Sequence, residues 1–81
     1  MVSRLTDLEK NQSAIITGFD DAETDLSIRL REIGFAEGDH VTPLHFGLFG
    51  KNPMSVRVNG ALIALRRQDA KAILVQTETE A

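Results

Sequence analysis

The sequence contains no cysteine, no tryptophan and no tyrosine, and it has only two prolines and four phenylalanines in 81 residues. Without cysteine the chain can form neither a disulfide framework nor a thiolate metal site. No segment is long and apolar enough to span a membrane, and the opening MVSRLTDLEKNQ lacks the apolar core of a secretory signal. We therefore predict a soluble, cytoplasmic protein that does not insert directly into a membrane.

The balance of charge argues against a nucleic-acid partner. Twelve acidic residues oppose nine basic ones, for a net charge of −3. Affinity for nucleic acid that is independent of base sequence comes from neutralising phosphates, which an acidic chain does poorly. A small barrel with a local basic patch that binds nucleic acid is retained only as the third of three alternatives.

Few residues in the sequence could perform catalysis or hold a metal. The two histidines, His40 and His45, lie five apart in an extended segment, and this odd spacing predicts side chains on opposite faces. GLFGKN lacks the spacing of a Walker phosphate loop. We predict a protein that is not an enzyme and has no built-in cofactor. The ligand spacing does not support a ferrous iron or zinc site, which would need a second molecule to complete it.

The length corresponds to one domain, predicted over residues 1–81. SAIITGF predicts a strand over residues 13–19, because it is rich in β-branched and aromatic side chains. Leu5 and Leu8, three residues apart, predict a short helical turn before that strand.

Further along the chain, HVTPLHF predicts an extended segment over residues 40–46 and AILVQ a closing strand over residues 72–76. RRQDAKA between the hairpin and this strand predicts a turn or a single helical turn. The polar tail, residues 77–81, is predicted to be disordered.

The segment from Asp20 to Gly34 predicts the one α-helix. Asp20 with Glu23 resembles a capping box at its start. Gly34 predicts a left-handed stop, in which the next residue, Phe35, packs on Leu30 as in a Schellman cap. Apolar residues at helical spacing predict one buried stripe: Ala22, Leu26, Leu30 and Ile33.

Asn59-Gly60 lies between two alternating apolar runs and predicts a type I′ hairpin over residues 54–66. That turn fixes a register with three inward pairs: Val58–Ala61, Val56–Ile63 and Met54–Leu65. The elements together predict a mainly β fold. We expect a small, partly open antiparallel barrel of about five strands with one inserted helix.

Two features could form a partner surface. Phe46, Leu48 and Phe49 occur in a glycine-flanked connection, where turns are normally polar. Alternation allows Phe46 or Leu48, but not Phe49, to point inward, so the loop is either structural or partly a docking surface. Five arginines are either solvated or converge into a patch beside the helix and hairpin: Arg29, Arg31, Arg57, Arg66 and Arg67.

Two segments of the sequence resemble one protein family. RLREIGFAEGDHV is similar to the R-L-x-x-x-G-(hydrophobic)-x-x-G-x-x-V signature of the FeoA family, small cytoplasmic accessory proteins of bacterial ferrous iron uptake. GKNPMSVRVNGALIALRRQDAKAILV resembles the family's second half, and the resemblance runs from about Leu5 to Val75. The segment FGLFGKNP departs from the family, because it is longer and more aromatic than the usual turn before the proline.

The resemblance implies an SH3-like barrel with an inserted helix. It further implies a non-enzymatic protein that binds the cytosolic GTP-binding domain of a ferrous iron permease, and so lies at the inner membrane through its partner. A role as a GTPase activator is a hypothesis for which Arg29 or Arg66 would be tested. The candidate partner-binding residues are Ile28, Arg29, Phe46, Leu48, Phe49, Lys51 and Arg66.

The main alternative is a metal-responsive module in which His40 or His45 from two chains share a ferrous or zinc ion, so self-association stays open. The fold also occurs as the C-terminal domain of metal-dependent repressors. A repressor is not expected, because no helix-turn-helix sequence precedes the barrel.

Overall fold

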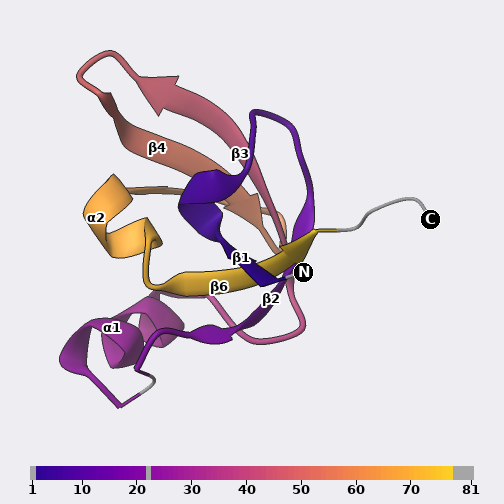
Figure 1. Cartoon of the computed structure of the whole chain (residues 1–81), viewed down its shortest axis with the longest axis vertical. Coiled ribbons are helices and arrows are strands. Elements are labelled where there is room, and N and C mark those ends of the chain that lie inside the picture. Colours follow the sequence, from indigo (N-terminus) through magenta and orange to yellow (C-terminus); the bar gives the residue numbers. More distant parts are fainter. Residues whose placement is uncertain (1, 22, 78–81) are drawn as a thin grey trace.

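The computed structural model describes residues 2–21 and 23–77, which form one six-stranded antiparallel sheet with two helices packed beside it (Figure 1). The elements in chain order are β1 (Val2–Arg4), a 3-10 turn η1 (Leu5–Asp7), β2 (Ala14–Phe19), α1 (Asp25–Ile33), β3 (His40–Gly47), β4 (Lys51–Val58), β5 (Ala61–Leu65), α2 (Arg67–Ala70) and β6 (Ile73–Thr77). The strand order is β1-β6-β2-β3-β4-β5. The predicted open antiparallel barrel is confirmed, with six strands rather than about five.

The β4–β5 hairpin has the predicted register. Its three inward pairs are Val58–Ala61, Val56–Ile63 and Met54–Leu65. Asn59 and Gly60 both adopt positive φ, at 51° and 79°, as a type I′ turn requires. The turn residues and the alternating pattern specify this hairpin without help from the rest of the chain.

Helix α1 begins at Asp25, so the prediction that it begins at Asp20 was wrong. Asp20 instead directly follows β2, and its amide donates a hydrogen bond of 2.7 Å to the carbonyl of Ala72, just before β6. Asp21 then takes a left-handed φ of 55°, and the side chain of Thr24 caps the helix. This long-range hydrogen bond outweighs the local preference of Asp20 for a helix N-terminus.

The end of α1 confirms the predicted stop. Gly34 has a φ of 139°, and the amide of Phe35 donates to the carbonyl of Leu30 at 3.1 Å. Phe35 is completely buried, as the Schellman cap predicts. Of the predicted stripe, Leu30 is buried, whereas Ile33 is 50% exposed because it lines an open groove. Ala22 lies outside the described residues.

The buried side chains of the described residues form one cluster inside the curved sheet. It consists of Leu5, Leu8, Ala14, Ile16, Phe19, Leu30, Phe35, Val41, Met54, Val56, Val58, Ala70, Ile73 and Val75. Leu5 and Leu8 come from the predicted helical turn, which thereby covers the floor of the barrel.

Both ends of the sequence differ from the prediction. β1 was not predicted, because three residues are too few to show a period; it pairs with β6 through Ser3 and Val75. Thr77 was assigned to the disordered tail, but it belongs to β6, where it pairs with Ala14. The rest of that tail, residues 78–81, lies outside the described residues.

Matched truncations of two phenylalanines test this core. We expect Phe35→Ala to lower the free energy of unfolding by about 3–5 kcal/mol, because the buried ring seals the end of α1. Phe49→Ala should change it by less than about 0.5 kcal/mol, because that ring is 84% exposed. Urea denaturation measures both, and equal losses would contradict this packing.

Candidate functional site

The loop between β3 and β4 projects two apolar side chains into solvent. Leu48 is 95% exposed and Phe49 is 84% exposed. Phe46, at the base of the loop, instead packs against the core, and the charged groups of Lys51 and Arg67 each lie 5.8 Å from its ring centre. Phe46 is thus the loop aromatic that points inward, and Leu48 and Phe49 remain available to a partner.

The base of this loop leaves no room for a side chain at Gly47. A Cβ placed there would overlap the carbonyl of Asn52 and lie 2.7 Å from the nitrogen of Pro53. Gly50 and Lys51 close the turn with φ near +63° and +65°. Close backbone approach therefore sets the shape of the loop and the direction of its exposed side chains.

A groove of about 450 Å³ begins beside the exposed loop, and we call it the loop groove. Its lining residues are Phe49, Asn52, Pro53, Arg66 and Gln68. Since Arg66 directly precedes α2 and Gln68 lies within it, this groove joins the loop to the short helix.

A second groove, of about 370 Å³, lies between α1 and the end of β5, and we call it the helix groove. Its lining residues are Leu26, Arg29, Leu30, Ile33, Ala64, Leu65, Arg66 and Asp69. Within the described part of the chain, neither Arg29 nor Arg66 has a hydrogen-bond or ion-pair partner for its side chain. With Asp69 as the only carboxylate of the lining, the groove has an excess of positive charge.

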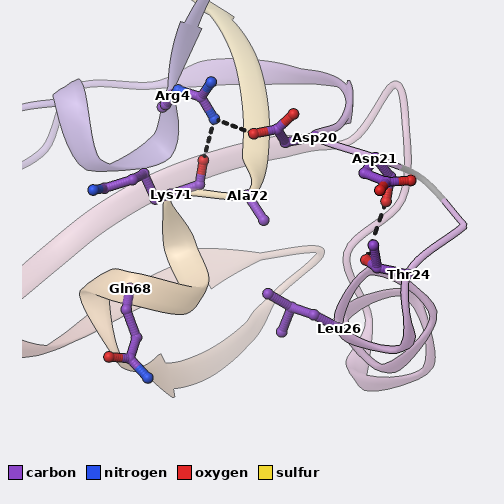
Figure 2. Close-up of a pocket in the computed structure, with 8 residues that line it drawn as sticks. All are labelled: Arg4, Asp20, Asp21, Thr24, Leu26, Gln68, Lys71 and Ala72. Carbon is purple, nitrogen blue, oxygen red and sulfur yellow. Dashed lines mark hydrogen bonds and ion pairs between the residues drawn. The ribbon is translucent and has the colours of Figure 1, made fainter.

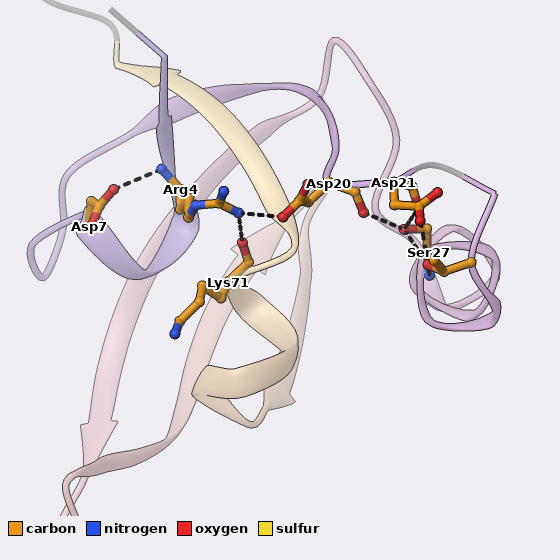
Figure 3. Close-up of polar contacts among 7 residues, drawn as sticks. Arg4, Asp7, Asp20, Asp21, Ser27 and Lys71 are labelled. Atoms are coloured by element: carbon orange, nitrogen blue, oxygen red, sulfur yellow. Dashed lines mark hydrogen bonds and ion pairs between the residues drawn. The ribbon is translucent and has the colours of Figure 1, made fainter.

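A third hollow, of about 340 Å³, lies between the start of α1 and the turn from α2 to β6 and is largely structural (Figure 2). Arg4 donates from one guanidinium nitrogen to the carboxylate of Asp20 at 3.0 Å and to the carbonyl of Lys71 at 2.8 Å (Figure 3). These bonds join β1, the end of β2 and the turn before β6. Leu26 also lines this hollow, so it shares a wall with the helix groove.

The structure brings together part of the predicted partner-binding set. Arg66 lines both the loop groove and the helix groove, and it connects Phe49 in one to Arg29 in the other. Ile28 is 46% exposed but lines neither groove. It follows Leu26 by two residues, about 200° around the helix, and so points away from the groove.

The predicted convergence of five arginines holds only for Arg29 and Arg66. The guanidinium of Arg31 lies 4.4 Å from the ring centre of Phe19 and packs α1 onto β2. Arg67 donates to the carbonyl of Thr6 at 3.1 Å. The remaining one, Arg57, lies on the outer face of β4.

The prediction that the two histidines lie on opposite faces was wrong. Pro43 pairs with Val56 but His45 pairs with Ser55, so Leu44 is the extra residue of a β-bulge. The bulge turns His45 to the same outward side as His40. The two still cannot share an ion, because five residues of strand span about 15 Å. Among the described residues, no group of three or more His, Asp or Glu side chains could hold a metal.

Sequence reasoning did not identify Ile33, Ala64 or Asp69 as surface-groove residues. Ile33 has the spacing of a core residue, and Ala64 is an ordinary strand residue; no local signal marks the meeting of α1 with β5. Within the described chain, no helix has the length and apolarity to cross a membrane.

Comparison with known proteins identifies the family of this chain and solved structures with the same fold. The model of the FeoA domain matches residues 3–77. FeoA of Stenotrophomonas maltophilia, solved in complex with zinc and described as a prokaryotic SH3 domain protein, is 33% identical, with a TM-score of 0.78 over 90% of this chain and 88% of that one. No curated protein matches the chain in sequence.

Two further structures share the fold at lower identity. A FeoA-like protein from Clostridium acetobutylicum is 22% identical, with a TM-score of 0.87 over 99% of this chain and 91% of that one. A manganese-dependent transcriptional repressor is 20% identical, with a TM-score of 0.81, and the match covers 94% of this chain but 41% of the repressor.

Alanine substitutions separate structural arginines from available ones. We expect Arg4→Ala to lower the free energy of unfolding by about 1 kcal/mol, since Arg4 joins Asp20 to the Lys71 carbonyl. Arg29→Ala and Arg66→Ala should change it by less than about 0.5 kcal/mol. Urea denaturation would reveal the difference, and a larger loss from Arg66→Ala would assign that side chain a structural role.

Proposed function

This chain belongs to the FeoA family, and we propose that it serves ferrous iron uptake by binding the cytosolic GTP-binding portion of a membrane iron permease. The S. maltophilia relative is named in connection with activation of ferrous iron transport, which supports the same process for this chain. Its place is then the cytoplasm, at the inner membrane through its partner.

The observation that carries the proposal is the exposed Leu48–Phe49 pair beside the loop groove. Phenylalanine and arginine are both enriched at protein interfaces, and here exposed Phe49 and Arg66, whose side chain has no partner among the described residues, line the same groove. A loop of this composition would otherwise cost solubility without adding to the core. The exposed loop and the loop groove are suited to binding a partner, and the proposed role is non-enzymatic.

A pair of matched truncations tests the docking face. We expect Phe49→Ala to weaken binding to the cytosolic domain of the permease by about tenfold or more, because the exposed ring would be buried in the complex. Ile28→Ala removes another exposed apolar side chain that lies outside both grooves and should leave binding unchanged. Isothermal titration with and without GTP measures both.

The absence of binding by the unsubstituted chain at high micromolar concentration would refute the proposal. The rate of GTP hydrolysis, followed in the same titration with Arg29→Ala and Arg66→Ala, would show whether either arginine acts on the partner's active site.

A second candidate is metal-dependent self-association. It is favoured by the bulge in β3, which places His40 and His45 on one outward face, and by the zinc complex of the S. maltophilia relative. Two chains meeting through this face could supply imidazole ligands to one zinc or ferrous ion.

Sedimentation with added zinc tests this second candidate. It predicts a dimer that forms only with the metal and is lost in His45→Ala, since a neutral imidazole is a zinc ligand and a methyl group is not. The matched variant Gln76→Ala, an exposed residue of β6, should still dimerise. An unchanged mass with zinc would remove this candidate.

A further inference from the structure

Strand β5 is an edge of the sheet that lacks the usual protection. Among the described residues it pairs only with β4, in a continuous register without a bulge, and its five residues are all apolar. Natural edge strands are normally short, charged, bulged or interrupted by proline, because an open row of backbone groups invites another chain to pair. The opposite edge, β1, is three residues long and carries Arg4.

The outward backbone groups of β5 belong to Leu62 and Ala64. In a two-residue hairpin the pair next to the turn, Val58–Ala61, is hydrogen-bonded, and every second pair after it is too. The amides and carbonyls of Leu62 and Ala64 therefore point away from β4. Among residues 2–21 and 23–77 no hydrogen bond to these outward groups is formed.

The side chains along this edge are also incompletely covered. Ile63 and Leu65 face inward opposite Val56 and Met54, which are fully buried, yet both remain partly exposed. On the outer side Leu62 is 65% exposed. A further strand beside β5 would cover all three, as the next strand of a closed barrel would.

The charge beside the edge indicates what kind of strand fits. The helix groove runs along Ala64 and Leu65 and contains Arg29 and Arg66, neither of which has a partner among the described residues. Both guanidinium groups can pair with carboxylates of an incoming segment. An extended segment with alternating apolar and acidic residues would pair with the open backbone groups of β5. Its apolar side chains would cover those of β5, and its carboxylates would pair with the two arginines.

We propose that β5 is a strand-docking site, where an extended, acidic segment of a partner protein adds as a seventh strand and its carboxylates pair with Arg29 and Arg66. This mode of binding uses main-chain hydrogen bonds for affinity and side chains for selection. The inference depends on the proposed function only in taking the cytosolic domain of the permease as the partner.

Amide exchange of the isolated chain with two synthetic peptides tests the site without that partner. With Glu-Val-Glu-Val-Glu we expect exchange at Leu62 and Ala64 to slow by about tenfold, while Ile63, already bonded to β4, changes little. The matched Lys-Val-Lys-Val-Lys should have no effect. Unchanged exchange at Leu62 and Ala64 with the acidic peptide would overturn the proposal.

Three variants then test the details. Ala64→Pro removes one outward amide and leaves the β4 ladder intact, so it should abolish protection at Leu62 while the chain stays folded. The double variant Arg29→Glu/Arg66→Glu should lose the acidic peptide, whereas Lys10→Glu, an exposed residue outside the grooves, should keep it. Normal binding of the acidic peptide by both Ala64→Pro and the double arginine variant would contradict the site.

The same exchange measurement with the cytosolic domain separates this inference from the proposed function. Domain binding that protects Leu62 and Ala64 supports both, and binding that leaves them unprotected overturns the strand-docking site alone. Protection by the peptide without domain binding overturns the proposed partner alone. If Leu62 and Ala64 were protected without any added peptide or domain, and the mass of the protein were doubled, a second copy of this chain would occupy the edge. That result would overturn the proposal.

Discussion

The open side of the sheet is the constraint on which the other surfaces depend. Within the described chain, β1 and β5 do not pair, and α2 lies instead between η1, which follows β1, and β4. Arg67 connects these two elements, because its guanidinium donates to the Thr6 carbonyl at 3.1 Å and its amide donates to the Asn52 side chain at 2.7 Å. Since a helix of four residues cannot replace a strand, hollows remain around it and one edge stays unpaired.

Helix α1 is held at both ends and open along one side. The fully buried Ser27 donates from its hydroxyl to the carbonyl of Asp21 at 3.0 Å, while Arg31 packs over Phe19 and Phe35 seals the far end. These contacts hold the helix against the end of β2. They leave the side with Arg29 facing β5. The structural arginine, Arg31, and the available one, Arg29, therefore lie on different sides of α1.

Local chemistry predicted the hairpin and the stop of α1, but it failed where a distant strand intervened. Asn59-Gly60 and Gly34 each need positive φ, a requirement that any neighbouring structure must satisfy. The start of α1 was misplaced because Asp20 pairs with Ala72, more than fifty residues away in the chain. Likewise the bulge at Leu44 reversed the expected face of His45, since alternation cannot foresee an extra residue in one strand.

By itself the sequence determined the class of fold, the hairpin register, the capped end of α1 and the presence of exposed apolar residues in the β3–β4 loop. These depend on neighbouring residues and on backbone conformations that few side chains allow. Only the tertiary structure decided which arginines lack partners among the described residues, that Phe49, Arg66 and Arg29 line connected grooves, and that β5 has no second neighbour within that part of the chain. Such properties arise when elements far apart in the chain pack together, and no local pattern records that geometry.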